Sequence, residues 1–115
     1  MPQDLINRSK SFALRIIKLC DAMPKTTAGK NIANQLLRSG TSIAANYRAS
    51  QRARSRAEFI SKIRIVLEES DEAQFWLELI MESGLLQEKK ISLIYQESKE
   101  LTAIFTTISK STFKR

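Results

Sequence analysis

Apolar residues recur every three or four positions along four successive stretches of the chain, which is the spacing of one face of an α-helix. The first stretch runs from about Asp4 to Ala22, the second continues to about Ser50, the third ends before Gly84, and the fourth begins near Gln87. The inward stripes, in chain order, are Leu5, Phe12, Ile16, Leu19 and Met23; Ile32, Leu36, Ile43 and Tyr47; Phe59, Ile63, Val66, Leu67, Leu77 and Ile80; and Ile91, Ile94, Leu101, Phe105 and Ile108. The pattern predicts four helices.

The breaks between these stretches carry residues that end or begin helices. Pro24 stops the first helix, and a threonine shortly after it can cap the second. Ser55 and Glu58 have the spacing of a capping box, so the third helix begins there, and Gly84 fits its C-terminal cap. Helices of about 20 residues are about 30 Å long. With such short connections they predict one all-α domain over residues 1–115, an antiparallel up-down-up-down four-helix bundle.

The segment RSGTSIAAN in the second stretch is rich in small residues. Gly40 and Ala44 lie four apart, so a neighbouring helix can approach the backbone closely there. Glycine inside a helix costs about 1 kcal/mol relative to alanine, and tight packing is the expected compensation. Asn46, seven residues after Ser39, fits either a partly buried amide that fixes helix register or a polar residue at the edge of the core.

Charge is distributed unevenly along the chain. Residues 1–67 hold 13 Lys and Arg against three acids, whereas residues 68–100 hold nine acids against three lysines, and the tail adds three cations to give the net charge of +7. One molecule therefore carries a basic and an acidic region. This favours an electropositive partner-binding surface or self-association between opposite patches.

Arginines lie on both sides of the turn that joins the second and third helices. In an up-down bundle this turn shares one end of the molecule with both chain termini, so distant parts of the sequence meet there. We call this end the basic pole and expect Arg8 to lie near it. Its candidate nucleic-acid-binding residues are Arg48, Arg52, Arg54, Arg56, Lys110, Lys114 and Arg115. The simpler interpretation is a solvated basic surface with no dedicated partner.

The third helix carries more apolar residues than one core can bury. Phe75, Trp76 and Leu79 point outside its inward stripe, so the segment FWLELIM is apolar nearly all round. Four helices cannot enclose one of their members, and we therefore expect this side to contact another copy of the chain. The acids just before it, with Glu68 and Glu72 among the candidate interface residues, could meet the arginines of a neighbouring subunit in a head-to-tail contact.

Several kinds of chemistry find no support in the sequence. It contains no histidine, no Gly-rich phosphate loop and no convergent carboxylate pair, so we expect neither an enzyme nor a metal or cofactor site. The lone Cys20 falls in an apolar pattern typical of a buried thiol in a reducing cytosol. No apolar run is long enough to span a bilayer and no signal peptide is evident, so we expect a cytoplasmic protein with no membrane contact.

The middle of the chain closely resembles the bacterial four-helix bundle proteins encoded within intervening sequences of 23S ribosomal RNA genes. The matching elements are Gln35, RSGTSIAAN through Asn46, Ser55, the pair Glu58-Phe59, Lys62, Glu68, Glu72 and WLELI from Trp76. The resemblance implies an antiparallel bundle that assembles into a homopentameric ring. A related group, the accessory proteins of diversity-generating retroelements, shares that ring and binds nucleic acid together with a reverse transcriptase. Where relatives have an acidic residue three positions after the asparagine, this chain has Ala49.

Two functions follow as hypotheses. The first is a non-catalytic oligomer whose basic pole binds RNA or DNA phosphates, with strong salt dependence and little sequence readout. The second is a structural or adaptor ring whose partner is another protein and whose arginines mostly pair with the acids of neighbouring subunits.

Overall fold

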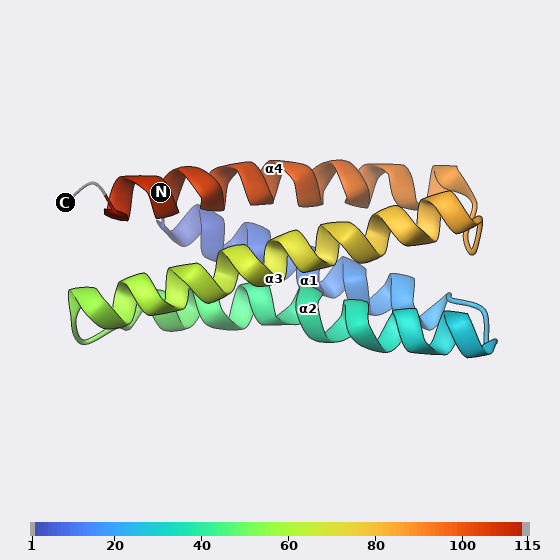
Figure 1. The fold of residues 1–115 in the computed structure, drawn as a ribbon, viewed down its shortest axis with the longest axis horizontal. Coiled ribbons are helices and arrows are strands. Elements are labelled where there is room, and N and C mark those ends of the chain that lie inside the picture. The colour runs from blue at the N-terminus through green and yellow to red at the C-terminus, as the bar shows by residue number, and fades with distance from the viewer. Residues whose placement is uncertain (1, 114–115) are drawn as a thin grey trace.

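The computed structural model describes residues 2–113, and within them the chain forms four α-helices and no β-strand. Helix α1 spans Pro2–Asp21, α2 spans Thr27–Gln51, α3 spans Arg56–Ser83 and α4 spans Glu88–Phe113. The helices lie side by side in an elongated molecule of 45 × 20 × 20 Å (Figure 1). The prediction of an all-α protein with four helices is confirmed, and the boundaries lie within about two residues of those expected from the sequence.

The helix ends are fixed by the residues that the sequence indicated. The Oγ1 of Thr26 accepts a hydrogen bond of 3.1 Å from the backbone N–H of Gly29, and the Oγ of Ser55 accepts one of 3.1 Å from the N–H of Glu58. Gly84 ends α3 in the left-handed region, at φ 76°, where a side chain is disfavoured. Each cap satisfies backbone groups that a helix end leaves without partners.

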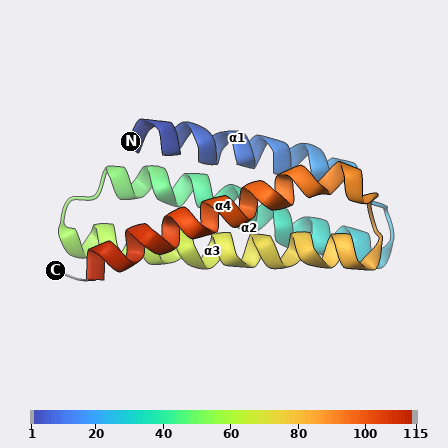
Figure 2. The same ribbon diagram turned by 90° about the horizontal axis from the view of Figure 1, so that it is seen from above.

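Consecutive helices pack along their length, and two contacts show how α1 and α2 are aligned. Between α1 and α2, Ile16 contacts Gly40, while the Cys20 thiol donates to the Ala33 carbonyl over 3.3 Å. Helix α1 packs much less on α4 than on α2, and Figure 2 shows the two diverging toward the end that holds the α2–α3 turn. That end also holds the beginning of α1 and the end of α4, and the other two turns lie at the opposite end (Figure 1).

One apolar core runs through the middle of the four helices. The inward stripes predicted from the sequence supply it, with five of their residues only partly buried at its margin: Leu5, Ile32, Phe59, Leu67 and Ile108. Gly40 allows a close approach between α1 and α2, because a Cβ at this position would lie 2.9 Å from both Cγ1 and Cγ2 of Ile16. The close packing expected at Gly40 is therefore present.

Polar groups within the core are satisfied mainly by their own helices. The hydroxyls of Ser9, Ser39 and Ser50 each donate to a carbonyl three or four residues earlier. Asn46 is half-buried, and its Nδ2 donates to the Ser42 carbonyl of the same helix over 2.9 Å. This hydrogen bond favours the edge-of-core interpretation of Asn46 over an amide that joins two helices.

None of the helices in residues 2–113 is both long enough and apolar enough to cross a membrane.

Candidate nucleic-acid and self-association surfaces

The arginines of the basic pole come from the end of α2, the following turn and the beginning of α3. Arg48, Arg52, Arg54 and Arg56 are all exposed. The guanidinium of Arg56 donates from Nη2 to the Thr112 carbonyl over 2.5 Å, which places the beginning of α3 against the last turn of α4. The distant segments that the predicted topology brought together thus lie side by side.

The charge environment of this end leaves its guanidinium groups largely in solvent. The side chain of Arg54 is 90% exposed, and its Nε lies 3.6 Å from the Glu58 carboxylate one turn later. An exposed pair at this spacing contributes only a few tenths of a kcal/mol, so it restrains the arginine weakly. Lys110 is exposed on α4, whereas Lys114 and Arg115 lie outside the described residues.

Arg8, which we expected near the basic pole, lines a hollow with Tyr47 and Ile108 and forms ion pairs between two helices. Its Nε and Nη2 donate to the two carboxylate oxygens of Glu97 over 2.7 and 2.8 Å, and Nη2 also donates to Glu100 over 2.7 Å. The hydrogen bonds to Glu97, reinforced by Glu100, raise the pKa of Arg8 above its ordinary value. Planar two-point pairing of this kind holds an arginine in place. Arg8 therefore fastens α1 to α4 and adds little to a phosphate-binding surface.

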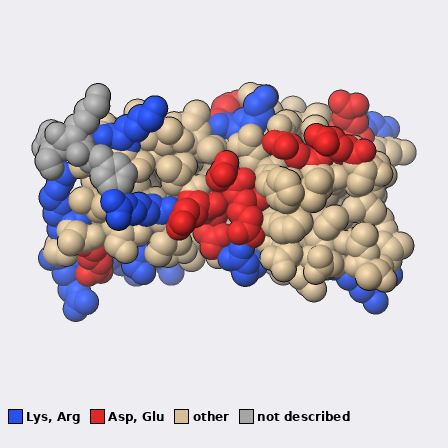
Figure 3. Space-filling model, in the orientation of Figure 1, with Lys and Arg blue, Asp and Glu red and all other residues tan. Residues whose placement is uncertain are grey.

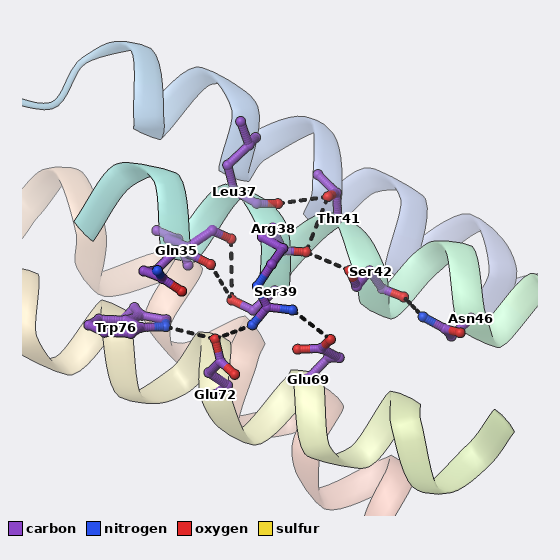
Figure 4. A network of polar contacts seen from close by, with 11 residues as sticks. Gln35, Leu37, Arg38, Ser39, Thr41, Ser42, Asn46, Glu69, Glu72 and Trp76 are labelled. Atoms are coloured by element: carbon purple, nitrogen blue, oxygen red, sulfur yellow. Dashed lines mark hydrogen bonds and ion pairs between the residues drawn. The ribbon is translucent and has the colours of Figure 1, made fainter. Parts of the chain in front are cut away.

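A second polar network joins α2 to α3 (Figure 4). It uses part of the acidic run, which consists of Glu68, Glu69, Asp71 and Glu72. Arg38 donates from Nη1 to Glu69 over 2.9 Å and from Nη2 to Glu72. The indole Nε1 of Trp76 also donates to Glu72, over 3.1 Å. The hydrogen bond from Trp76, together with the contact from Arg38, lowers the pKa of Glu72 below its ordinary value.

This network changes the interpretation of the acidic residues. Glu69 and Glu72 already pair within the chain, so Glu72 does not offer its carboxylate freely to a neighbouring subunit as the sequence hypothesis supposed. Glu68 and Asp71 are exposed on the outer side of α3. Any contact between the acidic run and another molecule therefore falls mainly to these two residues.

Next to the acids, α3 carries the apolar residues expected at a contact surface. Phe75 is 49% exposed, and its ring lies edge-on to the ring of Trp76 with centroids 5.2 Å apart. Trp76 and Leu79 are half-buried. Figure 3 shows the arrangement on this face: cations at the basic pole, acids over the middle of α3 and again where its second half borders α4, and an uncharged area over the first half of α2 and the adjoining edge of α3.

The sequence reasoning missed an apolar surface on α1 and α2. Leu14 and Ile17 on α1 are 55% and 42% exposed, and Leu37 on α2 is 38% exposed. Leu37 points toward the α1 side of α2, while Arg38 points toward α3 (Figure 4). The signal was present in the sequence, because Leu14 and Ile17 lie off the inward stripe of the first helix.

Neither a thiol nucleophile nor a metal site emerges from the described residues. Cys20 is buried, and this burial, with the nearby Asp21 carboxylate, raises the pKa of its thiol to about 11. Within residues 2–113, no three His, Cys, Asp or Glu side chains group in a way that could hold a metal ion.

Comparison with known proteins places the chain among proteins of the same architecture. A family model described as 23S rRNA-intervening sequence protein matches residues 2–107. The chain is similar to a protein of unknown function from the S23 ribosomal protein family of Bacteroides thetaiotaomicron, known from its crystal structure. The two share 34% identity and a TM-score of 0.86, over 95% of this chain and 97% of that one. No match was found among curated proteins.

Proposed function

The chain belongs to the 23S rRNA-intervening sequence protein family, and from this premise we propose that it is a non-catalytic, cytoplasmic protein that binds RNA or DNA phosphates as an oligomer. In this proposal the four helices form an antiparallel up-down-up-down bundle. The bundle self-associates through the exposed side of α3, as a pentamer by resemblance to the family.

The observation that carries the proposal is the exposure of the basic pole. Arg48, Arg52 and Arg54 present their guanidinium groups at one end of the molecule, where the pair between Arg54 and Glu58 is weak. Guanidinium groups bind phosphate oxygens through paired N–H donors, and such contacts give affinity without reading sequence. A cyclic oligomer would repeat the basic pole around its rim, which multiplies the number of phosphate contacts.

Titration of a labelled single-stranded RNA and a labelled DNA duplex at about 50 and 200 mM salt tests this function. The variant Arg52→Glu/Arg54→Glu should weaken binding and lower the slope of affinity against salt by about one unit for each phosphate that the variant no longer binds. The matched control is Lys25→Glu/Lys30→Glu, the same charge change on exposed residues near the opposite end. Absence of binding at the lower salt, or equal losses in both variants, would contradict the proposal.

A second candidate, an adaptor for a protein partner, is favoured by a different surface. Leu93 on α4 is 76% exposed and lies in a surface hollow of about 340 Å³ between α1 and α4. Four cations line this hollow: Arg15, Lys18, Lys89 and Lys90. An apolar floor with a cationic rim fits an acidic amphipathic helix of a client protein.

The variant with both arginines of the turn reversed separates the two functions. If Arg52→Glu/Arg54→Glu remains oligomeric by light scattering but no longer binds RNA, the nucleic-acid function is supported. If the same variant loses its oligomeric state, these arginines pair with acids of a neighbouring copy, which favours the adaptor.

A further inference from the structure

Four of the five large hydrophobic side chains that are exposed in residues 2–113 lie on two separate faces. The α3 patch consists of Phe75 with its half-buried neighbours Trp76 and Leu79. The α1/α2 patch consists of Leu14, Ile17 and Leu37. Assembly into a pentamer, as in the proposed function, requires a different surface that receives the α3 patch. The assignment of that surface therefore rests on the proposed function.

The residues of the α1/α2 patch are brought together by the packing of α1 on α2. Gly40 lies against Ile16, and Leu37, nearly one turn earlier in α2, lines a surface hollow with Cys20 and Asp21 of α1. Leu37 is therefore beside the turn of α1 that contains Ile17. A patch built from two helices in fixed contact is a rigid surface, which suits recognition by another rigid helix.

A shallow recess continues this patch toward the basic pole. Ile6 and Lys10 of α1 and Ala44, Ala45 and Arg48 of α2 line a hollow of about 160 Å³. The small alanine side chains leave this space, and the two cations lie at its edge. The α1/α2 patch thus has an apolar part followed by a recess flanked by positive charge.

The α3 patch has the complementary order of charge. The exposed acids Glu68 and Asp71 precede Phe75 by about two turns and one turn, on the side toward the basic pole. On α1, Lys10 precedes Leu14 by one turn, also on the side toward the basic pole. On each patch the apolar residues are therefore nearer the α1–α2 turn and the charges nearer the basic pole, with opposite signs.

The two patches also lie at similar heights along the molecule. Arg38 reaches Glu72, one turn before Trp76, and Gly40, only two residues from Arg38, contacts Ile16. The middle parts of α1, α2 and α3 are thus at one level. Two copies standing side by side in the same orientation would bring Phe75 of one to the level of Leu14 and Ile17 of the other.

From this complementarity we propose that the α1/α2 patch is the acceptor surface for the α3 patch of a second copy of the chain. Phe75 packs on Leu14 and Ile17, and Glu68 and Asp71 approach Lys10. The two surfaces differ, so each added copy leaves one of each kind unoccupied. Such a contact closes into a ring when the rotation between copies permits.

Cross-linking between single-cysteine variants tests the assignment directly. In a Cys20→Ser background, Leu14→Cys and Phe75→Cys are prepared separately, mixed, and treated with a short bismaleimide. The mixture should give a cross-linked pair of chains, whereas either variant alone should give none. Leu93→Cys is the matched control, because Leu93 is exposed but lies outside both patches; it should cross-link with neither variant.

Charge reversal supplies a readout that does not alter the apolar residues. Lys10→Glu and Glu68→Lys should each weaken association about tenfold, because each places like charges opposite one another. The double variant should return association to near the wild-type value, because the two exchanged charges again attract each other. Light scattering over a range of concentrations measures this.

The outcomes separate this inference from the function on which it rests. If light scattering shows an oligomer and Phe75→Cys cross-links with itself, the contact is two-fold. If Phe75→Cys cross-links with Leu93→Cys, the acceptor surface is a different one. Either result overturns the acceptor assignment and leaves self-association standing. A chain that stays monomeric at every concentration contradicts both the acceptor assignment and the proposed self-association.

Discussion

Replacement of Gly40 by alanine tests whether the contact between α1 and α2 is as close as the structure has it. The added Cβ would lie 2.9 Å from both Cγ1 and Cγ2 of Ile16, which is fully buried and cannot move aside freely. Forcing a methyl group into a filled core costs about 1–3 kcal/mol. The same change removes a glycine from a helix interior, which contributes about 1 kcal/mol. The net expectation for Gly40→Ala is a loss of about 1 kcal/mol in the free energy of unfolding.

Removing the obstructing side chain should reverse the sign of this effect. Ile16→Ala on its own costs about 2–5 kcal/mol, because it leaves a cavity in the core. In that background the new methyl at position 40 meets empty space, so Gly40→Ala should stabilise by the helix-propensity gain of about 1 kcal/mol. The two substitutions should therefore couple by about 2 kcal/mol, as contacting residues do.

Urea unfolding followed by far-ultraviolet circular dichroism measures the free energy of unfolding of wild type, the two single variants and the double variant. All four are measured at one protomer concentration, because association also stabilises the folded state. Ala103→Gly on the exposed side of α4 calibrates propensity and should cost about 1 kcal/mol. If Gly40→Ala stabilises the wild-type chain by the amount that Ala103→Gly destabilises it, the close packing against Ile16 is refuted.

Three further predictions concern single sites. Gly84→Ala should lower the free energy of unfolding by about 1–2 kcal/mol, since Gly84 adopts φ 76°, and an unchanged urea midpoint would contradict this. The Cys20 thiol, with its pKa raised to about 11, should react with a thiol reagent at pH 8 far more slowly in the folded chain than in urea; equal rates would show an accessible thiol. Because its folded-state pKa is lowered, Glu72 stabilises the fold above the ordinary glutamate range and loses this effect as the pH falls through the lowered value. The difference in the free energy of unfolding between wild type and Glu72→Gln should therefore become smaller in acid. A difference independent of pH would exclude a stabilising role of the Glu72 carboxylate.

The helices and their ends could be predicted because their signals are local. The capping of α3 by Ser55 and its termination at Gly84 depend on residues within one turn of each boundary. Exposure of Phe75 was likewise predictable, since the helical period alone places it off the inward stripe. In each of these cases the interacting groups are neighbours in sequence.

The ion pairs between helices could not be predicted in the same way. Arg38 meets Glu69 and Glu72 across 31 and 34 residues, and Arg8 meets Glu97 across 89 residues. Which charges face one another depends on the axial shift between helices, and the packing of Gly40 on Ile16 helps to fix that shift. A displacement of one turn would give each arginine different neighbours, so the pairing of Arg8 with Glu97 and Glu100 could not be predicted from the sequence.

The attachment of α1 to α4 differs from the contacts between the other neighbouring helices. The other neighbouring helices are joined by extensive apolar packing, whereas the first half of α1 meets α4 largely through Arg8 and two glutamates. Attraction between partly exposed charges is screened by dissolved ions. We therefore expect a higher ionic strength to weaken this helix pair more than the others, and water to enter first beside the hollow of about 380 Å³ lined by Leu5, Tyr47 and Ile108.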